Sequence, residues 1–210
     1  MDNISVIIRN RNEERYIGYA IQSVLDTFDK PEIIVVDNNS TDNSMGIVNT
    51  FDFENIKTYS IDGYTPGKSL NYGVTKCSND YILVLSAHSQ IMNCEFGKIK
   101  GLLDEHCVVG GKQIPVWNGK KISRRYVWSN FEEHDIINQA SESENRYFLH
   151  NAFAFYTKQT LIKYPFDENL SGKEDRYWVN DRIKEGMDSY YDSVTTCHHH
   201  YTDNGATWKG

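Results

Sequence analysis

The sequence lacks a long apolar run, closely spaced cysteines and an excess of positive charge. No stretch approaches the roughly 18 apolar residues that a membrane-spanning helix requires, so no transmembrane segment is expected. The four cysteines form no C-x-x-C pair, which predicts free thiols rather than disulfides or a zinc site. A net charge of −7 argues against a general surface for nucleic acid. With no leader pattern after Met1, these features together predict a cytoplasmic protein.

Short apolar runs alternate with helical patterns through the first 90 residues. Residues 81–85 are all apolar or aromatic, as expected of a strand that is buried on both faces. Residues 4–8 and 32–36 form similar runs, and apolar residues recur at helical spacing over residues 17–25. The alternation predicts an α/β fold whose first half is a doubly wound, nucleotide-binding sheet flanked by helices.

The pattern is looser after residue 90, but it still predicts several elements. These are a short strand at 107–111, an edge strand or loop at 148–156, a helix at 174–185 and a last strand at 188–196. In the first half, Ser40 or Thr41 is expected to cap the helix that contains Met45.

Polar clusters follow the strongest predicted strands. Residues 9–14, 37–42 and 86–90 each come at the carboxyl end of an apolar run. Ligands bind at this edge of an open α/β sheet, and a purely structural protein does not need such clusters on successive strands. The recurrence therefore favours a functional edge over three solvated loops, and His88 is expected in or near the site.

Three features have a structural interpretation as well as a functional one. Glu174 and Asp175 begin a predicted helix, where carboxylates also complement the helix dipole. Lys68 stands at another predicted helix start and suits either an anionic ligand or solvent. Residues 198–200 are consecutive histidines, and at most two of them share one face of a strand. These alternatives stay open on residue pattern alone.

Four segments resemble motifs of glycosyltransferase family 2, a large family of inverting enzymes with the GT-A fold. Residues 5–13 resemble its first strand and nucleotide loop, and residues 33–42 resemble its second strand and acidic loop. Residues 67–73 resemble its glycine, basic residue and Asn-x-Gly segment. Residues 166–168, followed by Glu174-Asp175, resemble its acceptor-side loop and Glu-Asp pair. One motif alone is weak, but four in the right order are specific.

The resemblance implies a single GT-A domain over residues 1–210, with a mixed sheet. Residues 1–90 would bind the nucleotide sugar and residues 91–210 the acceptor. The implied activity is inverting transfer of a sugar from a nucleotide-sugar donor, with a UDP-sugar favoured, to a saccharide or lipid-linked acceptor. The implied setting is surface or exopolysaccharide synthesis, which is compatible with peripheral contact at the inner face of the membrane.

The resemblance also implies roles for particular residues. Asp175 would be the general base, and Glu174 is the second catalytic candidate. Asp37 would accept a hydrogen bond from the nucleotide base, and Glu13 would bind the ribose hydroxyls. The remaining donor-binding candidates are Arg9, Asn10, Arg11, Asn39, Lys68, Asn71, Ser86, Ala87 and His88.

One departure concerns the metal. The family usually carries an Asp-x-Asp motif after the central strand, which holds a divalent metal on the donor diphosphate. Here the matching residues are Ser86-Ala87-His88, so the use of manganese or magnesium stays open. His88, His198 and His200 are the candidate ligands, although imidazole favours softer metals than magnesium. A donor with one phosphate, such as a CMP-sugar, would need a metal less.

The residue pattern bears on two other function classes. The missing motif keeps open a nucleotide-sugar-binding protein of the same fold with weak or no catalysis. A nucleotidyltransferase is disfavoured, because residues 9–13 contain no glycine for a phosphate-binding loop.

Overall fold

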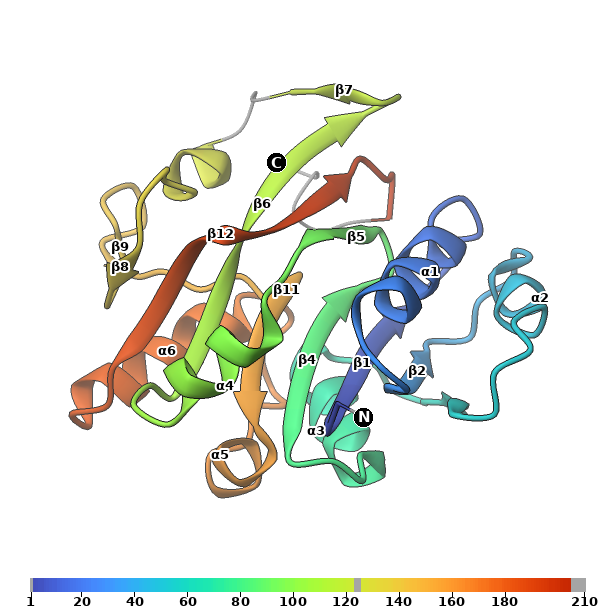
Figure 1. The fold of residues 1–210 in the computed structure, drawn as a ribbon, viewed down its shortest axis with the longest axis horizontal. Coiled ribbons are helices and arrows are strands. Elements are labelled where there is room, and N and C mark those ends of the chain that lie inside the picture. The colour runs from blue at the N-terminus through green and yellow to red at the C-terminus, as the bar shows by residue number, and fades with distance from the viewer. Residues whose placement is uncertain (1, 123–125, 205–210) are drawn as a thin grey trace.

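The computed structural model describes residues 2–122 and 126–204, and Figure 1 shows its large central sheet. The elements of the first half follow the predicted alternation of strand and helix. They are β1 (Ile4–Asn10), α1 (Ile17–Thr27), β2 (Glu32–Asp37), α2 (Ser44–Val48), β3 (Ile56–Ser60), α3 (Pro66–Lys76) and β4 (Tyr81–Ser86).

The second half is richer in short strands. Its longer elements are β5 (Ser89–Asn93), α4 (Phe96–Leu103), β6 (Val108–Trp117), β11 (Phe153–Thr157), α5 (Lys158–Lys163), α6 (Glu174–Lys184) and β12 (Ser189–His200). Between β6 and β11 lie β7 (Lys120–Lys121), a 3-10 helix η1 (Tyr126–Asn130), β8 (Ile136–Ile137), β9 (Ala140–Ser141) and β10 (Arg146–Tyr147).

The main sheet has ten strands, and its principal path runs β3-β2-β1-β4-β11-β6-β12-β5. The four strands from the first half are parallel to one another. β11 then pairs antiparallel with both β4 and β6. The sheet is therefore mixed, as predicted, and strands from both halves of the chain contribute to it (Figure 1).

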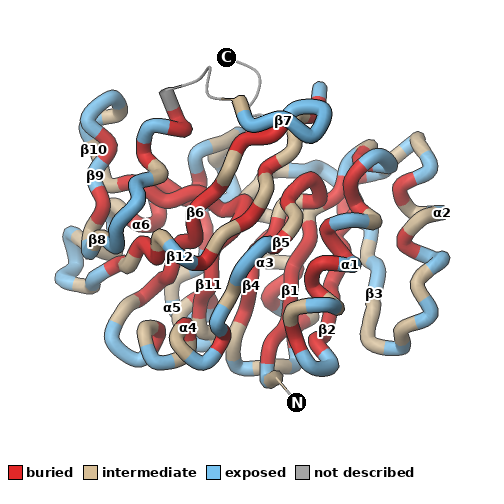
Figure 2. Tube along the Cα trace, turned by 45° about the horizontal axis from the view of Figure 1, so that its top comes forward, coloured by how far each residue is buried: buried red, intermediate tan, exposed pale blue. Residues whose placement is uncertain are grey.

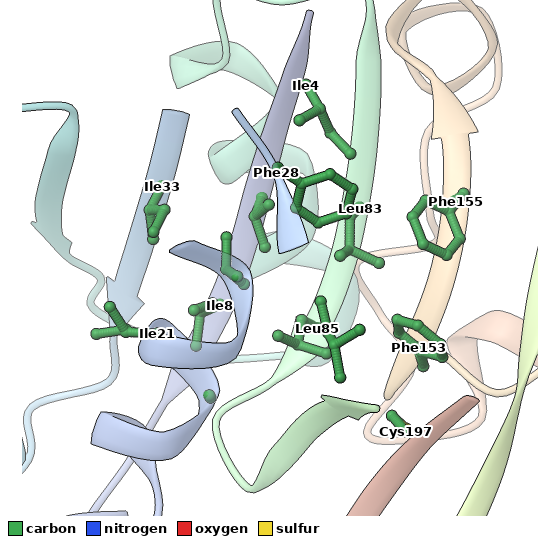
Figure 3. Close-up of a cluster of buried hydrophobic side chains, with 14 of the residues drawn as sticks. Ile4, Ile8, Ile21, Phe28, Ile33, Leu83, Leu85, Phe153, Phe155 and Cys197 are labelled. Carbon is green, nitrogen blue, oxygen red and sulfur yellow. The ribbon is translucent and has the colours of Figure 1, made fainter. Parts of the chain in front are cut away.

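Hydrophobic clusters cover both faces of the sheet. Side chains alternate along each strand, so Ile8 faces one cluster and Ile7 the other. Figure 3 shows the first cluster, where Ile8, Leu85 and Phe153 come from adjacent strands. Figure 2 shows the buried residues concentrated along these strands. Each fully buried aliphatic side chain of this kind stabilises the fold by about 1.5–3 kcal/mol.

The helices divide between the two clusters according to their apolar residues. α1 and α4 pack on the first cluster, while α3, α5 and α6 pack on the second. The apolar face predicted for residues 17–25 is the buried face of α1. The prediction of a buried central strand is also confirmed, because Ile82, Leu83, Val84 and Leu85 are all fully buried.

Several predictions for the second half are wrong in position or extent. Of residues 148–156, predicted as an edge strand or loop, residues 148–152 are a loop, but β11 is no edge strand, because it lies between β4 and β6 in the interior of the sheet. The strand predicted at 107–111 extends to Trp117, and the last strand continues through His200. The two extensions pair with each other in parallel, residues 197–200 beside residues 113–116, so each strand lengthens against the other.

The predicted cap of α2 is also wrong. Asn43, rather than Ser40 or Thr41, occupies the N-cap position, and its side chain makes no capping bond. The Ser40 hydroxyl instead donates to Asp37 Oδ1 at 2.6 Å. The carboxylate at the end of β2 thus uses the hydroxyl that the sequence pattern assigned to the helix.

The state of the cysteine thiols and the length of the helices bear on the predictions of free thiols and of no transmembrane segment. All four cysteines are free thiols, as predicted, and burial raises the pKa of Cys77 and Cys107 to about 12. Compared with the thickness of a bilayer, every helix in the described ranges is too short or too polar to span a membrane.

Gly111 in β6 provides a test of the packing between β6, β11 and β12, and Gly101 in α4 serves as its control. An alanine Cβ at Gly111 would meet the buried Phe153 ring and lie 3.0 Å from the Thr195 carbonyl oxygen. We expect Gly111→Ala to lower the free energy of unfolding by about 1–3 kcal/mol through overpacking. Gly101 is the matched control, because nothing lies within 4 Å of an added Cβ in α4.

Gly101→Ala should stabilise the protein by up to about 1 kcal/mol. Alanine lowers the backbone entropy of the unfolded chain, so less entropy is lost when this helix position folds. Urea unfolding followed by circular dichroism measures both variants. Equal stability of the two alanine variants would contradict the packing described here.

Candidate active-site cleft

A cavity of about 710 Å³ opens at the edge of the sheet where β1 and β4 end. Its size is typical of a small-molecule or cofactor site. The segments that line it come from the loop after β1, the end of β4, the residues before β11, the start of α6 and the end of β12. Both halves of the chain therefore contribute to the lining.

The structure divides the predicted site residues into two groups. Those that line the cavity are Arg9, Asn10, Arg11, Glu13, Ser86, His88, Glu174 and Asp175. Those that lie outside the lining are Asp37, Asn39, Lys68, Asn71, Ala87, His198 and His200. The first group combines the loop after β1 with the start of α6, which are more than 150 residues apart in the chain.

Asp37 lies beneath the lining and organises it. Its carboxylate accepts hydrogen bonds from Asn10 Nδ2 at 2.8 Å, from the Ser40 amide at 3.0 Å and from the Ser40 hydroxyl. The parallel register places Asn10 directly beside Asp37. The predicted contact of Asp37 with a nucleotide base stays a prediction, and the observed contacts give Asp37 a role in holding Asn10.

Lys68 and Asn71 are engaged elsewhere. Lys68 Nζ donates to the carbonyl oxygens of Asp62 at 2.7 Å and Gly63 at 3.3 Å. Asn71 exchanges two hydrogen bonds with the backbone of Phe166 and donates to Glu168 at 2.9 Å. The motif at residues 67–73 therefore connects α3 to the loop before α6 rather than reaching into the cavity.

Two other predicted donor-binding residues also lie away from the cavity. Asn39 is exposed, with a positive φ of 50°, and its amide donates to Asp62 at 3.4 Å. Ala87 is buried in the hydrophobic cluster around α1.

An ion pair crosses the floor of the cleft. Arg9 Nη1 lies 2.9 Å from Glu174 Oε1, and both side chains are largely buried. Burial raises the pKa of Glu174 despite the opposing attraction of Arg9. Burial disfavours the charged form of Arg9, but Tyr64, Glu174 and Asp175 outweigh it, and the pKa of Arg9 is raised. Arg9 therefore stays charged beside the ligand cavity.

Asp175 is held in one orientation by three hydrogen bonds. Its Oδ2 accepts from the Asn151 amide at 2.9 Å, and its Oδ1 accepts from the Arg176 amide at 2.8 Å and from Arg176 Nη1 at 3.4 Å. A carboxylate has about four acceptor positions, so one position on Oδ2 is left for a further donor. Since Asp175 also lines the cavity, that donor can be a bound hydroxyl.

A chain of hydrogen bonds links the loop after β1 and the turn between β4 and β5 to the end of β12. Glu13 Oε1 lies 3.1 Å from His88 Nδ1, and His88 Nε2 lies 3.0 Å from His199 Nε2. His199 Nδ1 then lies 2.9 Å from Gln113 Oε1, while the Gln113 amide donates to the His150 carbonyl oxygen. Because Gln113 Oε1 can only accept, His199 carries its proton on Nδ1 and accepts at Nε2 from His88.

The three consecutive histidines of β12 point in alternate directions. His199 meets His88, whereas the His200 ring stacks on Tyr16 with centroids 4.8 Å apart. His198 stands edge-on to His200 at 6.1 Å. The predicted set of His88, His198 and His200 is therefore not brought together, because the residue that approaches His88 is the middle histidine of the run.

The described residues do not form a metal site. Within residues 2–122 and 126–204, no group of three His, Cys, Asp or Glu side chains is arranged to hold a metal. The other positions, 1, 123–125 and 205–210, contain none of these residue types. Among the described residues, His88 Nε2 and His199 Nε2 lie 3.0 Å apart, and the His150 ring centroid lies 5.6 Å from that of His199.

Several lining residues were missed by sequence reasoning. Among them are Tyr64, His150, Asn151, Lys173 and Arg176, whereas His199 was considered only as one of the three consecutive histidines. His150 and Asn151 reach the cleft because β11 runs antiparallel to β4, which places the start of β11 beside the end of β4. For His199 a signal existed, since it shares a strand face with Cys197, a residue type that is usually buried.

Comparison with known sequences identifies the relatives of this chain. A sequence profile described as glycosyl transferase family 2 matches residues 5–165. A Campylobacter jejuni GalNAc(5)-diNAcBac-PP-undecaprenol beta-1,3-glucosyltransferase is 24% identical over 86% of this chain. A Methanococcus voltae dolichyl N-acetyl-alpha-D-glucosaminyl phosphate 3-beta-D-2,3-diacetamido-2,3-dideoxy-beta-D-glucuronosyltransferase is 30% identical over 42% of it.

Solved structures show the same fold. S. aureus TarS in complex with UDP-GlcNAc superimposes over 99% of this chain with a TM-score of 0.74 and 22% identity. The GT-A fold predicted from the sequence is thereby confirmed. The chain spans 60% of the TarS chain, 60% of the Campylobacter relative and 30% of the Methanococcus relative.

The buried histidine beside the cleft predicts an acid-sensitive fold. Burial, followed by repulsion from Arg176, lowers the pKa of His150 to about 3. In the unfolded chain the His150 imidazole binds a proton near pH 6.5, whereas in the folded chain it stays neutral to much lower pH. Stability is therefore lost as the pH falls below about 6.5. We expect this residue alone to cost about 2 kcal/mol between pH 8 and pH 5.

His150→Gln removes that titration and should flatten the stability curve over the same range. Urea unfolding of the wild type and the variant at pH 8.0, 6.5 and 5.0 measures the difference. Parallel curves would show that His150 does not titrate between the folded and unfolded states.

Proposed function

Because the chain belongs to glycosyl transferase family 2, we propose that it is an inverting glycosyltransferase that moves a sugar from a nucleotide-sugar donor to a saccharide or lipid-linked acceptor. The observation that carries the proposal is the placement of Asp175. The residue lines a ligand-sized cavity, its carboxylate keeps one acceptor position unused, and the cavity is also lined by the loop after the first parallel strand.

A UDP-sugar is the proposed donor. Two TarS structures hold UDP-GlcNAc and UDP, and the nucleotide-loop motif at residues 5–13 belongs to the part of the chain that the family profile matches. Asn10, Arg11 and Glu13 line the cavity and are positioned for the nucleoside. Arg9 and Arg11 supply positive charge for the diphosphate, which gains negative charge as it leaves.

A lipid-linked saccharide is the proposed acceptor. The Campylobacter relative is named for an undecaprenol diphosphate substrate and the Methanococcus relative for a dolichyl phosphate substrate. By this likeness we place the reaction in surface glycan synthesis, at the cytoplasmic face of the membrane. With a net charge of −7, the chain is not attracted to anionic headgroups as a whole. The lipid anchor of the acceptor, rather than this attraction, would bring the acceptor and the enzyme together.

The proposed reaction is one direct displacement. Asp175 Oδ2 takes the proton from the acceptor hydroxyl while that oxygen forms a bond to the anomeric carbon. The bond from the anomeric carbon to the diphosphate oxygen breaks at the same time, so the sugar configuration inverts. Asn151 and Arg176 hold the carboxylate in place for this step, which removes the need to orient it during the reaction.

Asp175→Asn tests the assignment of the base. The amide keeps the size of the side chain but cannot take the proton, so transfer should fall by at least about 100-fold. UDP affinity, measured by calorimetry, should stay within about twofold of the wild type, because Asp175 is assigned to the acceptor step. Asp175→Ala should lose transfer to the same extent.

Glu185→Gln is the matched control, because this exposed carboxylate lies at the other end of α6. Its transfer rate should equal that of the wild type. Normal transfer by Asp175→Asn would refute the base assignment. If the wild type binds UDP but transfers no sugar to any acceptor, the protein is a nucleotide-sugar-binding member of the family instead.

A further inference from the structure

We propose that the cleft binds the donor diphosphate through its own side chains, without a divalent metal. This inference rests on the proposed function and specifies how the site would recognise its donor. It departs from the metal-bound diphosphate that the family resemblance implies, and it follows from the ligands and charges of this chain.

The carboxylates of the cleft are already committed to protein partners. Glu13 contacts His88 and accepts from Thr202 at 3.3 Å, while Glu174 pairs with Arg9. Asp175 accepts three hydrogen bonds from the backbone and side chain around it. Magnesium and manganese bind mainly to oxygen ligands, usually through carboxylates that are free to coordinate. A metal at Glu13 or Glu174 would compete with these buried contacts, and the position left on Asp175 Oδ2 is the one assigned to the acceptor hydroxyl.

The imidazoles are committed in the same way. One ring nitrogen of His88 contacts Glu13 and the other contacts His199. Ser86, at the first position of the replaced motif, is a neutral hydroxyl 3.2 Å from His88 Nε2. Catalytic zinc sites use three protein ligands, whereas only two nitrogens converge among the described residues. The set therefore falls short for softer metals as well as for harder ones.

Permanent positive charge is already present where a metal would supply it. Among the described residues, the charged side chains of the lining are four cations, Arg9, Arg11, Lys173 and Arg176, and three carboxylates, Glu13, Glu174 and Asp175. Glu144, outside the lining, pairs with Lys173 and Arg176 from behind. Arg11 is exposed and forms no ion pair within the described residues, so its guanidinium is available to a ligand.

Guanidinium groups suit this task because they hold phosphate oxygens with two parallel hydrogen bonds. Arg9, near the end of β1, is fixed by Glu174 on the floor of the cleft, and Arg11 lies two residues later in the loop after β1. The end of β1 and its loop thus bring one anchored and one free guanidinium to the same cavity. Together they take the role that Asp-x-Asp and its metal have in the family pattern.

The test compares UDP binding in EDTA with UDP binding in manganese chloride, using the whole chain and calorimetry. We expect the dissociation constants in the two buffers to agree within about twofold. Titration of Mn²⁺ followed by electron paramagnetic resonance, with UDP present, should show no ion held by the protein beyond that bound by UDP alone. Sugar transfer should continue in EDTA.

Arg11→Ala provides the variant, since this exposed side chain can be removed without unfolding the protein. It should weaken UDP binding by about tenfold, the usual worth of a hydrogen bond to a charged group, and equally in both buffers. Lys184→Ala, an exposed lysine of α6 outside the cavity lining, should leave UDP affinity unchanged.

Two results would overturn the proposal. One is a tenfold or greater loss of UDP affinity in EDTA that manganese restores, and the other is unchanged affinity in Arg11→Ala. Failure of the underlying function looks different, because UDP and UDP-GlcNAc would then fail to bind in either buffer. Metal-dependent binding would thus reject this inference and keep the proposed function.

Discussion

The antiparallel pairing of β11 with β4 is the constraint on which the cleft depends. It places Phe153 beside Leu85, so the residues before β11 lie at the edge where β4 ends. The Ser86 amide donates to the Ala152 carbonyl oxygen across this junction at 3.1 Å. From the same segment, the Asn151 amide holds Asp175. Without this pairing, the parallel strands would still present their polar loops, but the proposed base would have no fixed position opposite them.

Charge and hydrogen bonding then connect the two halves across the cavity. Arg9 pairs with Glu174, and Glu13 joins His88 and His199. These groups are buried, where an unpaired charge is costly and a satisfied network fixes geometry. The same bonds that stabilise the cleft also occupy its ligands, which links the stability of the site to its proposed independence from metal.

The sequence predicted local elements well and long-range placement poorly. The helical spacing of residues 17–25 and the apolar run at residues 81–85 correspond to α1 and β4, because periodic burial is a property of a few consecutive residues. The interior position of β11 was missed, because the local sequence of residues 148–156 does not indicate which strands will pair with it. Lys68 matches a family motif, yet its ammonium group binds the carbonyl of Asp62 outside the cavity.

By itself the sequence determined the α/β class, the parallel first half and the family, because apolar periodicity and ordered motifs are written along the chain. It also placed Arg9, Glu13, His88 and Asp175 as candidates, and all of them line one cavity. Only the tertiary structure decided which histidine of β12 meets His88 and which residues hold Asp175. Strand alternation allows either face to turn inward, and the choice depends on the strands beside β12, which are distant in sequence.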